Sequence, residues 1–310
     1  MSEHRTRDHV LSFALFVAGI ALAGLALLVG LVWWQQERIV FQPPSAVVDV
    51  AGYPAVRQVH YQAADGQQLF AYVVQPAPAG AQGRGGELQD SPRGVLLVFH
   101  GNADLAGWCV PWGVEVARRT GWTVLLAEYR GYGGLPGIPT YERAKLDARA
   151  AYTFVRDSLG ARPSEVAIFG HSLGSAVATE LAADVRPAAL LLQSPFTSAR
   201  AMARMIITPP VVGLFWDVIA RVHYDTEARV RTLDTPVHVV HGDRDLVIPV
   251  RMGRLVHAAA RIPGALLVVR GAGHNDLPNS GEAYWAWLAE ALKSRDEWRV
   301  ASGEWRVAGN

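Results

Sequence analysis

The sequence has a single cysteine and almost no net charge, and both features exclude some classes of protein. Cys109 is the only cysteine among 310 residues, so the chain can form no intramolecular disulfide and no thiolate metal cluster. The 29 Lys and Arg residues nearly balance the 28 Asp and Glu residues, and the formal net charge is +1. Without a basic block to neutralise a phosphate backbone, we expect no nucleic-acid partner.

Sequence motifs for metals and nucleotide cofactors are also missing. His171, His223 and His241 form no H-x-x-x-H spacing and no other ligand pattern with carboxylates. The segment from Gly131 to Gly134 superficially resembles a phosphate-binding loop, but it lacks the glycine spacing and the helix start that such a loop needs. We therefore expect neither a metal nor a cofactor.

Long apolar runs are represented by one segment near the N-terminus. Val10 to Trp34 holds no charged residue over about 25 positions, which is enough for a helix to cross a hydrocarbon core about 30 Å thick. A cleaved signal peptide is the alternative, with small residues at Ala21 to Ala23, but the apolar run continues beyond them. We expect residues 1–34 to be an uncleaved anchor that contacts the membrane through residues 10–34. Arg5 and Arg7 before the run, against Arg38 after it, place the following domain outside the cytoplasm.

Short apolar runs alternate with amphipathic stretches through the rest of the chain. The runs expected to be strands are Val59 to Tyr61 and Leu69 to Val74, joined as a hairpin, then Val95 to Phe99, Val124 to Ala127, Val166 to Phe169, Leu190 to Gln193, Val237 to Val240 and Leu266 to Val269. The helical patterns are Tyr141 to Leu159, Ser172 to Asp184, Val250 to Ala260 and Glu282 to Ser294. This alternation predicts an α/β domain with a mainly parallel, doubly wound sheet of about eight strands.

The same pattern divides the chain into segments. We expect a linker at 35–57, the α/β domain at 58–294 and a polar C-terminal tail at 295–310. Within the domain, residues 198–233 interrupt the alternation and hold the apolar stretch Met205 to Ile219, which is broken by prolines. We interpret this insertion as a small lid beside the strand ends, whose apolar groups face either the core or an acyl pocket.

The segment Gly170-His171-Ser172-Leu173-Gly174 matches the G-x-S-x-G nucleophile elbow. It follows an apolar strand and opens a helical stretch, and this strand-turn-helix placement makes a weak pattern much more specific. Ser172 is therefore the candidate nucleophile. The side chain of His171 points away from that of Ser172, so we assign His171 a packing or lining role.

A serine hydroxyl needs a base to accept its proton and a carboxylate to orient that base. His274 follows the last apolar strand in a glycine-rich turn and is the candidate base, because the other histidines lie in strands, helices or the lid. Asp243 and Asp245 both follow an earlier strand, and spacing alone does not separate them. Backbone N–H donors for an oxyanion are expected at Asn102, after a glycine that follows a strand, and at Leu173.

Six motifs together carry a resemblance to a known family: HGNADL, EYRGYGG, GHSLG, SPFTS, HGDRDLVIP and GAGHND. From about Phe41 to Leu292 the chain resembles the α/β-hydrolase superfamily and, within it, the Bem46-like, ABHD13-like and ABHD17-like group. This resemblance implies the α/β-hydrolase fold and identifies the acid as Asp245, which leaves Asp243 as a turn residue. Gly134 stands where many relatives have serine, a position that is not catalytic in them.

These expectations combine into one functional hypothesis with named alternatives. The chain is expected to be a membrane-anchored serine hydrolase that cleaves carboxylic esters or thioesters of a small-molecule or acyl substrate through an acyl-enzyme on Ser172. A protein depalmitoylase, a lipase or a peptidase acting at the membrane is the alternative. A tethered binding protein without catalytic activity is the alternative of another class.

Overall fold

The computed structural model describes residues 2–76, 93–206 and 219–293, with only the backbone described for residues 2–8. Most of the apolar stretch Met205 to Ile219 and the tail expected at 295–310 lie outside the described residues.

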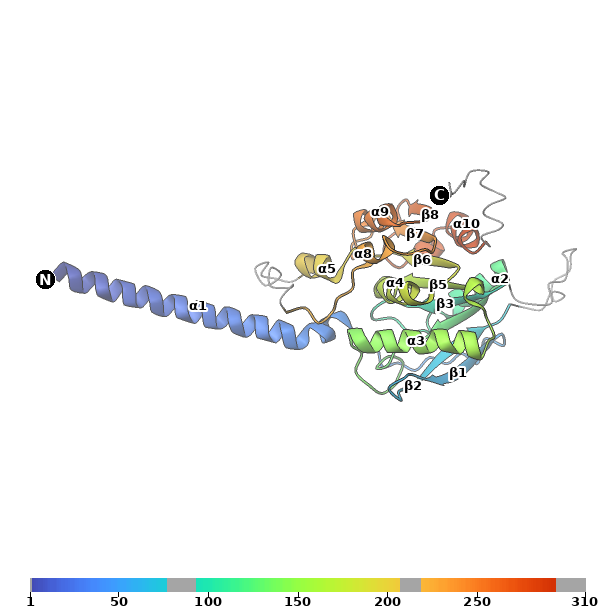
Figure 1. Cartoon of the computed structure of the whole chain (residues 1–310), viewed down its shortest axis with the longest axis horizontal. Coiled ribbons are helices and arrows are strands. Elements are labelled where there is room, and N and C mark those ends of the chain that lie inside the picture. The colour runs from blue at the N-terminus through green and yellow to red at the C-terminus, as the bar shows by residue number, and fades with distance from the viewer. Residues whose placement is uncertain (1, 77–92, 207–218, 294–310) are drawn as a thin grey trace, which may run out of the picture.

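Eight strands form one sheet in the order β1-β2-β4-β3-β5-β6-β7-β8 (Figure 1). The strands are β1 (Val56–Gln62), β2 (Gln68–Val74), β3 (Val95–Phe99), β4 (Thr123–Ala127), β5 (Val166–His171), β6 (Ala189–Gln193), β7 (Val237–Gly242) and β8 (Pro263–Val269). The hairpin β1-β2 joins β4 antiparallel, and the pairs from β4 to β8 are parallel. The predicted α/β-hydrolase fold with a mainly parallel sheet of about eight strands is confirmed.

The central strands are largely apolar because helices cover both faces of the sheet. All five residues of β3 are buried. Val95, Leu97 and Phe99 pack into the core on one face, while Leu96 and Val98 pack into the core on the other. Side chains alternate between the two faces of a strand, so a strand covered on both sides must be apolar at every position.

The helices of the domain divide between the two faces of this sheet. They are α2 (Val110–Thr120), α3 (Tyr141–Asp157), α4 (Leu173–Val185), α5 (Ala199–Ile206), α8 (Thr226–Val230), α9 (Val250–Ala259) and α10 (Glu282–Ala291), with short 3₁₀ turns at Pro163–Glu165 and Leu277–Asn279. Residues of α2 and α10 belong to one core cluster, and residues of α3, α4, α8 and α9 belong to the other.

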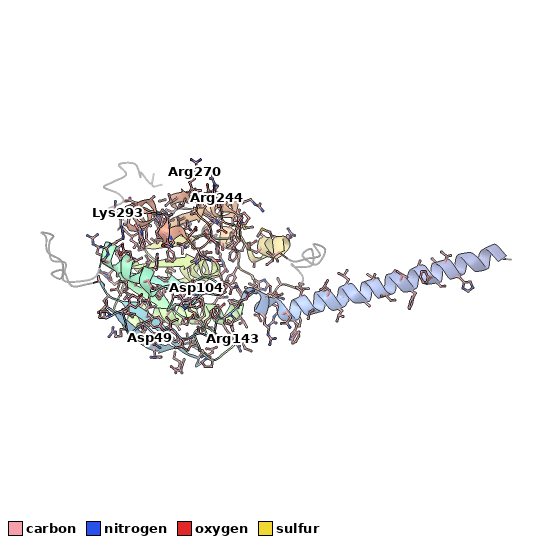
Figure 2. The ribbon with its side chains drawn as sticks, turned by 180° about the vertical axis from the view of Figure 1, so that it is seen from behind. Asp49, Asp104, Arg143, Arg244, Arg270 and Lys293 are labelled. Carbon is pink, nitrogen blue, oxygen red and sulfur yellow. The ribbon has the colours of Figure 1, made fainter. Side chains whose placement is uncertain are left out.

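The N-terminal helix α1 (Ser2–Val40) projects away from the domain (Figure 1). Its His9–Val40 part is long and apolar enough to cross a membrane, with a mean hydropathy of 2.7 over its most apolar window. Only 6% of that window is buried against the rest of the protein, and most of its side chains stand free in the view from behind (Figure 2). An apolar helix without a protein partner is typical of a segment placed in lipid.

The segment expected to be a linker at 35–57 is only partly extended. Helix α1 continues six residues past Trp34, because Gln35 to Val40 contains neither glycine nor proline to stop it. The chain that follows packs on the domain: Phe41 is buried, and Val48 fills the space beside Gly107, where a Cβ would lie 2.5 Å from the Val48 side chain. Strand β1 then begins at Val56.

The insertion at 198–233 is fixed at its base. An isolated bridge pairs Ser198 with Asp225, and Asp225 caps the N-terminus of α8 by accepting from Ala228 N at 2.9 Å. Tyr224 and Val230 are buried in the core. The described ends of the insertion are therefore integral to the domain, and α5 lies at its outer side (Figure 1).

Candidate active site

Ser172 occupies a strained turn between β5 and α4. Its backbone has φ 53° and ψ −117°, a conformation that residues other than glycine rarely adopt. The turn is so tight that a Cβ at Gly170 would lie 2.2 Å from Gly174 O, and a Cβ at Gly174 would lie 2.1 Å from Phe99 O. Both glycines are therefore required, and the turn presents the Ser172 hydroxyl at the N-terminus of α4.

The structure brings Ser172, His274 and Asp245 together from three different loops. Ser172 Oγ lies 2.9 Å from His274 Nε2, and His274 Nδ1 lies 2.7 Å from Asp245 Oδ2. Because the carboxylate can only accept, His274 carries its proton on Nδ1 and leaves Nε2 free to accept the serine proton. This is the arrangement that activates a serine nucleophile.

The carboxylate of Asp245 is held on both of its oxygens. Oδ1 accepts from Val247 N and Ile248 N, both at 2.8 Å, while Oδ2 also lies 3.2 Å from Nε2 of the buried His241. Burial alone would raise the pKa of Asp245, but hydrogen bonds from His241, His274 and the Ile248 amide outweigh it and hold the pKa well below its usual value. Asp245 therefore stays ionised at neutral pH and can accept the hydrogen bond from His274 Nδ1.

Asp243, the other carboxylate that spacing left open, lies elsewhere. Its Oδ1 accepts from Gly271 N at 2.6 Å, on the exposed side of the turn. That bond ties the loop after β7 to the loop after β8, which carries His274. The geometry therefore pairs His274 with Asp245 and gives Asp243 a role in the turn.

His171 lies against the candidate base without replacing it. Its ring centroid is 5.1 Å from that of His274, and its Nε2 donates to His274 O at 3.3 Å. Burial, assisted by the neighbouring His274, lowers the pKa of His171 to about 3. A neutral His171 thus supports the backbone that carries His274.

The two expected oxyanion donors lie beside Ser172. Leu173 is the first residue of α4, so its N–H has no acceptor within the helix. Asn102 lies in the loop after β3, and its side chain is already engaged, because Oδ1 accepts from Gln42 N at 2.8 Å and from the Tyr132 hydroxyl at 3.0 Å. These bonds hold the loop through the side-chain oxygen of Asn102, and the backbone amide of Asn102 remains the expected oxyanion donor.

A buried pair beneath this loop was missed by the sequence analysis. His100 Nε2 lies 2.7 Å from Glu128 Oε1, and Glu128 Oε2 accepts from Ala106 N at 3.0 Å. His100 Nδ1 also donates to Gly101 O at 2.9 Å. Burial works against protonation of His100, but Glu128 outweighs it and raises the pKa of His100. The pair therefore fixes both ends of the loop that contains Asn102.

The signal for this pair was present in the sequence. Strands β3 and β4 run parallel and in register, with Phe99 opposite Ala127, so the next residues along each strand, His100 and Glu128, must face each other. Both belong to motifs that follow predicted strands. Placing the two strands side by side would have found the contact.

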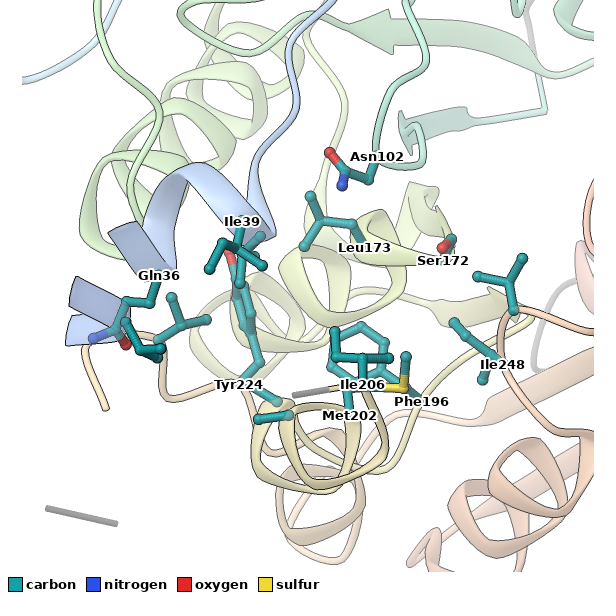
Figure 3. Close-up of a pocket in the computed structure, with 16 residues that line it drawn as sticks. Gln36, Ile39, Asn102, Ser172, Leu173, Phe196, Met202, Ile206, Tyr224 and Ile248 are labelled. Atoms are coloured by element: carbon teal, nitrogen blue, oxygen red, sulfur yellow. The ribbon is translucent and has the colours of Figure 1, made fainter. Parts of the chain in front are cut away.

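Two pockets of different character meet at Ser172. The first, called here the apolar pocket, has a volume of about 180 Å³ (Figure 3). Its walls include Phe196, Met202, Ile206, Tyr224 and Ile248. The second, called here the polar pocket, is an open cleft of about 620 Å³ whose walls include Asp104, Trp108, Trp112, His171, Gln193 and Asn275.

A serine presented at a strand-to-helix elbow, at the carboxyl edge of a mainly parallel sheet, defines a hydrolase of the α/β type. The comparisons agree. A family model described as serine aminopeptidase, S33 (Hydrolase_4) matches residues 90–228. Rv2307c of Mycobacterium tuberculosis, an uncharacterized protein, is 35% identical over 84% of this chain and 87% of its own length. The chain belongs to the α/β-hydrolase superfamily, in the group of ABHD-type proteins that its motifs indicated.

Relatives with functional names match over a shorter span. Human alpha/beta hydrolase domain-containing protein 17B is 31% identical over 61% of this chain and 62% of its own length. Zebrafish (Danio rerio) lysophosphatidylserine lipase ABHD12 is 30% identical over 54% of this chain and 47% of its own. Among solved structures, the esterase Pf2001 of Pyrococcus furiosus has a TM-score of 0.62 at 17% identity, covering 81% of this chain and 97% of that one. That likeness shows the shared fold.

Proposed function

We propose that the protein is a membrane-anchored serine hydrolase that cleaves carboxylic esters or thioesters through an acyl-enzyme. The observation that carries this proposal is the continuous hydrogen-bonded chain from Ser172 through His274 to Asp245. The hydrolase family and the esterases among its fold neighbours support it.

In the first half of the reaction, Ser172 Oγ attacks the carbonyl carbon of the substrate while its proton passes to His274 Nε2. The carbonyl oxygen becomes negative and accepts from the amides of Asn102 and Leu173. Asp245 stabilises the imidazolium that forms. Collapse then breaks the C–O or C–S bond, and the departing alcohol or thiol takes the proton from His274.

In the second half, water takes the place of the leaving group. Its proton passes to His274 as its oxygen attacks the acyl carbon, and the bond to Ser172 Oγ then breaks. Ser172 regains its proton from His274, and a carboxylic acid leaves. The two pockets suit this division, because the acyl part needs an apolar site and the leaving group needs a more polar one.

A lipase or protein depalmitoylase is the narrower form of this function that a specific observation favours. The apolar pocket begins at Ser172 and is lined by aliphatic and aromatic side chains, which suit an alkyl chain. A relative named as a lipase points the same way. The family model's description raises peptide hydrolysis as the alternative, and the same site chemistry serves both.

The anchor forms part of the proposal. The length and composition of His9–Val40 support a single membrane span, and the arginine distribution favours a catalytic domain outside the cytoplasm. Carbonate extraction followed by protease protection of the intact chain tests both statements. Release by carbonate would contradict the span, and a domain that is protected in intact cells but digested in inverted vesicles would reverse the expected topology.

The decisive experiment labels the active serine. A fluorophosphonate probe should react with the full chain in detergent and fail to react with the Ser172→Ala variant. The same preparation is then assayed with acyl esters, acyl thioesters and peptide amides. Labelling without ester or thioester turnover would favour a peptidase, and absence of labelling would favour the non-catalytic binding protein.

A further inference from the structure

The end of the N-terminal helix reaches the catalytic site. Val32, Gln36, Ile39 and Val40 all line the apolar pocket. Their spacing of four, three and one residues puts them on one face of α1, in its last turns (Figure 3). A helix that acted only as a membrane tether would not need to contact the pocket beside Ser172, so this contact indicates a second role for α1.

Helix α5 forms the opposite wall with the same geometry. Ala199, Met202, Ala203 and Ile206 line the pocket, and this spacing again defines one helical face. Ser172 lies at the inner end, where α4 begins. The pocket is therefore a slot between α1 and α5 that begins at the nucleophile (Figure 3).

A buried glutamine holds the α1 wall in place. The side chain of Gln36 is 1% exposed; its Nε2 donates to Ile219 O at 2.7 Å, and its Oε1 accepts from Arg221 N at 2.5 Å. Outside this clamp, Arg221 pairs with Glu37 at 3.0 Å and stacks over Trp33 at 5.5 Å. An amide buried with both of its ends satisfied makes a specific contact, because leaving either end unpaired is costly.

The chain that leaves α1 is also tied to the oxyanion loop. Two residues past the helix, Gln42 N donates to Asn102 Oδ1 at 2.8 Å, and further on Gly133 N donates to Pro44 O at 3.1 Å. The last turns of α1 are thus fixed at Gln36 on one side and at Asn102 on the other. The wall is a defined part of the site.

The outer end of the slot is apolar and solvent-exposed. Ile39 and Ile206 line the pocket and yet are 42% and 57% exposed. The apolar helix of 32 residues from His9 to Val40 would measure about 48 Å at 1.5 Å per residue, more than the about 30 Å of a hydrocarbon core. Its last turns therefore extend to the membrane interface, where Trp33 and Trp34 would lie. Exposed apolar side chains at that level are suited to contact with lipid.

We propose that α1 is a wall of the substrate site as well as an anchor: a single acyl chain held in the bilayer passes between α1 and α5 and presents its ester or thioester carbonyl to Ser172. This inference rests on the proposed acyl-ester hydrolysis and specifies where the acyl chain enters. Val32 and Ile39 become specificity-determining residues, and Gln36 positions the wall.

A matched pair of variants in the full chain tests this assignment. Val32→Trp fills the slot, whereas Leu31→Trp makes the same kind of change at an adjacent position that is 49% exposed and does not line the pocket. With both proteins in phosphatidylcholine nanodiscs, hydrolysis of p-nitrophenyl acetate and p-nitrophenyl decanoate is compared. The decanoate-to-acetate ratio of kcat/KM should fall about tenfold in Val32→Trp, as expected for the loss of about two buried methylenes, and stay at the wild-type value in Leu31→Trp.

Equal ratios in the two variants would overturn the proposal. No turnover of either ester by wild-type protein would instead remove the proposed function, so the two failures are distinguishable. Cross-linking gives an independent reading: a long-chain fluorophosphonate with a terminal diazirine, bound at Ser172 and irradiated, should modify α1 or α5. Modification of residues 100–112 instead would place the acyl chain in the polar pocket and overturn the assignment.

Discussion

The apolar and polar pockets share Ser172 but are built from different parts of the fold. The polar pocket is formed largely by strand ends and by loops that follow β3, β5, β7 and β8, at the carboxyl edge of the sheet. The apolar pocket adds the end of α1 and helix α5 of the insertion at 198–233. Ser172, His274 and Asp245 thus come from the fold itself, whereas much of the apolar wall comes from segments added to it.

This difference separates chemistry from selectivity. Ligands of open α/β sheets bind at the carboxyl ends of the strands, and that edge carries Ser172, His274 and Asp245 here. Helices outside the sheet can change in length or sequence without moving those groups. We therefore expect changes at strand ends to affect turnover of every substrate and changes in α1 or α5 to affect substrates according to their acyl chain.

The largest effect is expected at the point where the pockets meet. Ser172→Ala should lower kcat by about 10⁴- to 10⁶-fold for every acyl chain and leaving group, because a catalytic unit loses nearly all its effect with its nucleophile. The thermal unfolding midpoint should change little. Turnover above a tenth of the wild-type value with any ester would show that another group attacks.

The next largest effect distinguishes the two aspartates. Asp245→Asn should lower kcat by about 10²- to 10⁴-fold, because an amide no longer fixes the tautomer of His274. Asp243→Asn is the matched control, because Asp243 lies in the same loop as Asp245 but accepts from Gly271 N and not from His274, and it should lower kcat far less. The reverse order in steady-state assays of the two variants would assign the acid to Asp243.

The residues at the carboxyl edge of the sheet were largely predictable from the sequence. Ser172, His274 and Asp245 each follow an apolar strand, and parallel strands bring their carboxyl ends to one edge, so local motifs were enough once the resemblance had chosen between Asp243 and Asp245. The pair of His100 and Glu128 was not found, because it depends on which strands are neighbours. Strand order is a property of the whole sheet.

The contacts that build the wall of the apolar pocket could not be predicted in this way. The contact of Gln36 with Ile219 and Arg221 joins residues more than 180 positions apart, and the sequence around Gln36 resembles the polar flank of any membrane helix. Helix α2 was also missed: β-branched residues and Gly113 lower its helix propensity, and it forms because Val110 and Val116 are buried against the sheet. Tertiary packing decided both features.

A smaller and more selective effect is expected from the wall of the apolar pocket. In the wild type, kcat/KM for p-nitrophenyl esters from acetate to decanoate should rise by up to about fourfold per methylene until the pocket is full, since each buried CH₂ contributes about 0.8 kcal/mol. Ala203→Phe should move the optimum to shorter chains. Arg204→Phe, at an exposed position beside it on α5, is the control.

Varying the alcohol instead of the acyl chain sharpens that test. Ala203→Phe should leave the order of preference among leaving groups unchanged, because these occupy the polar pocket. A wild-type optimum at acetate, with steady decline thereafter, would remove the acyl-pocket assignment.

The smallest effect is expected at His171, which lines the polar pocket, and it appears in how the free energy of unfolding depends on pH. The pKa of His171 is about 3 in the folded protein and about 6.5 in an unfolded chain, so between these values the unfolded state binds more protons. The wild type therefore loses stability as pH falls from about 6.5 towards 3. Gln at this position cannot take up the proton, and its amide can still donate to His274 O.

Urea unfolding of His171→Gln and wild type at pH 7 and pH 4.5 measures this difference. The wild type should lose more unfolding free energy on acidification, by at most about 1.4 kcal/mol for each pH unit. Asp245 does not interfere, because its depressed pKa contributes stability that is lost only as pH falls below about 3.9, the usual value for an aspartate. The raised pKa of His100 contributes stability that is present below about 6.5 and is lost only at higher pH, equally in both proteins. Parallel pH dependences would mean that His171 is protonated within the fold, and the polar wall beside His274 would then carry a positive charge in mild acid.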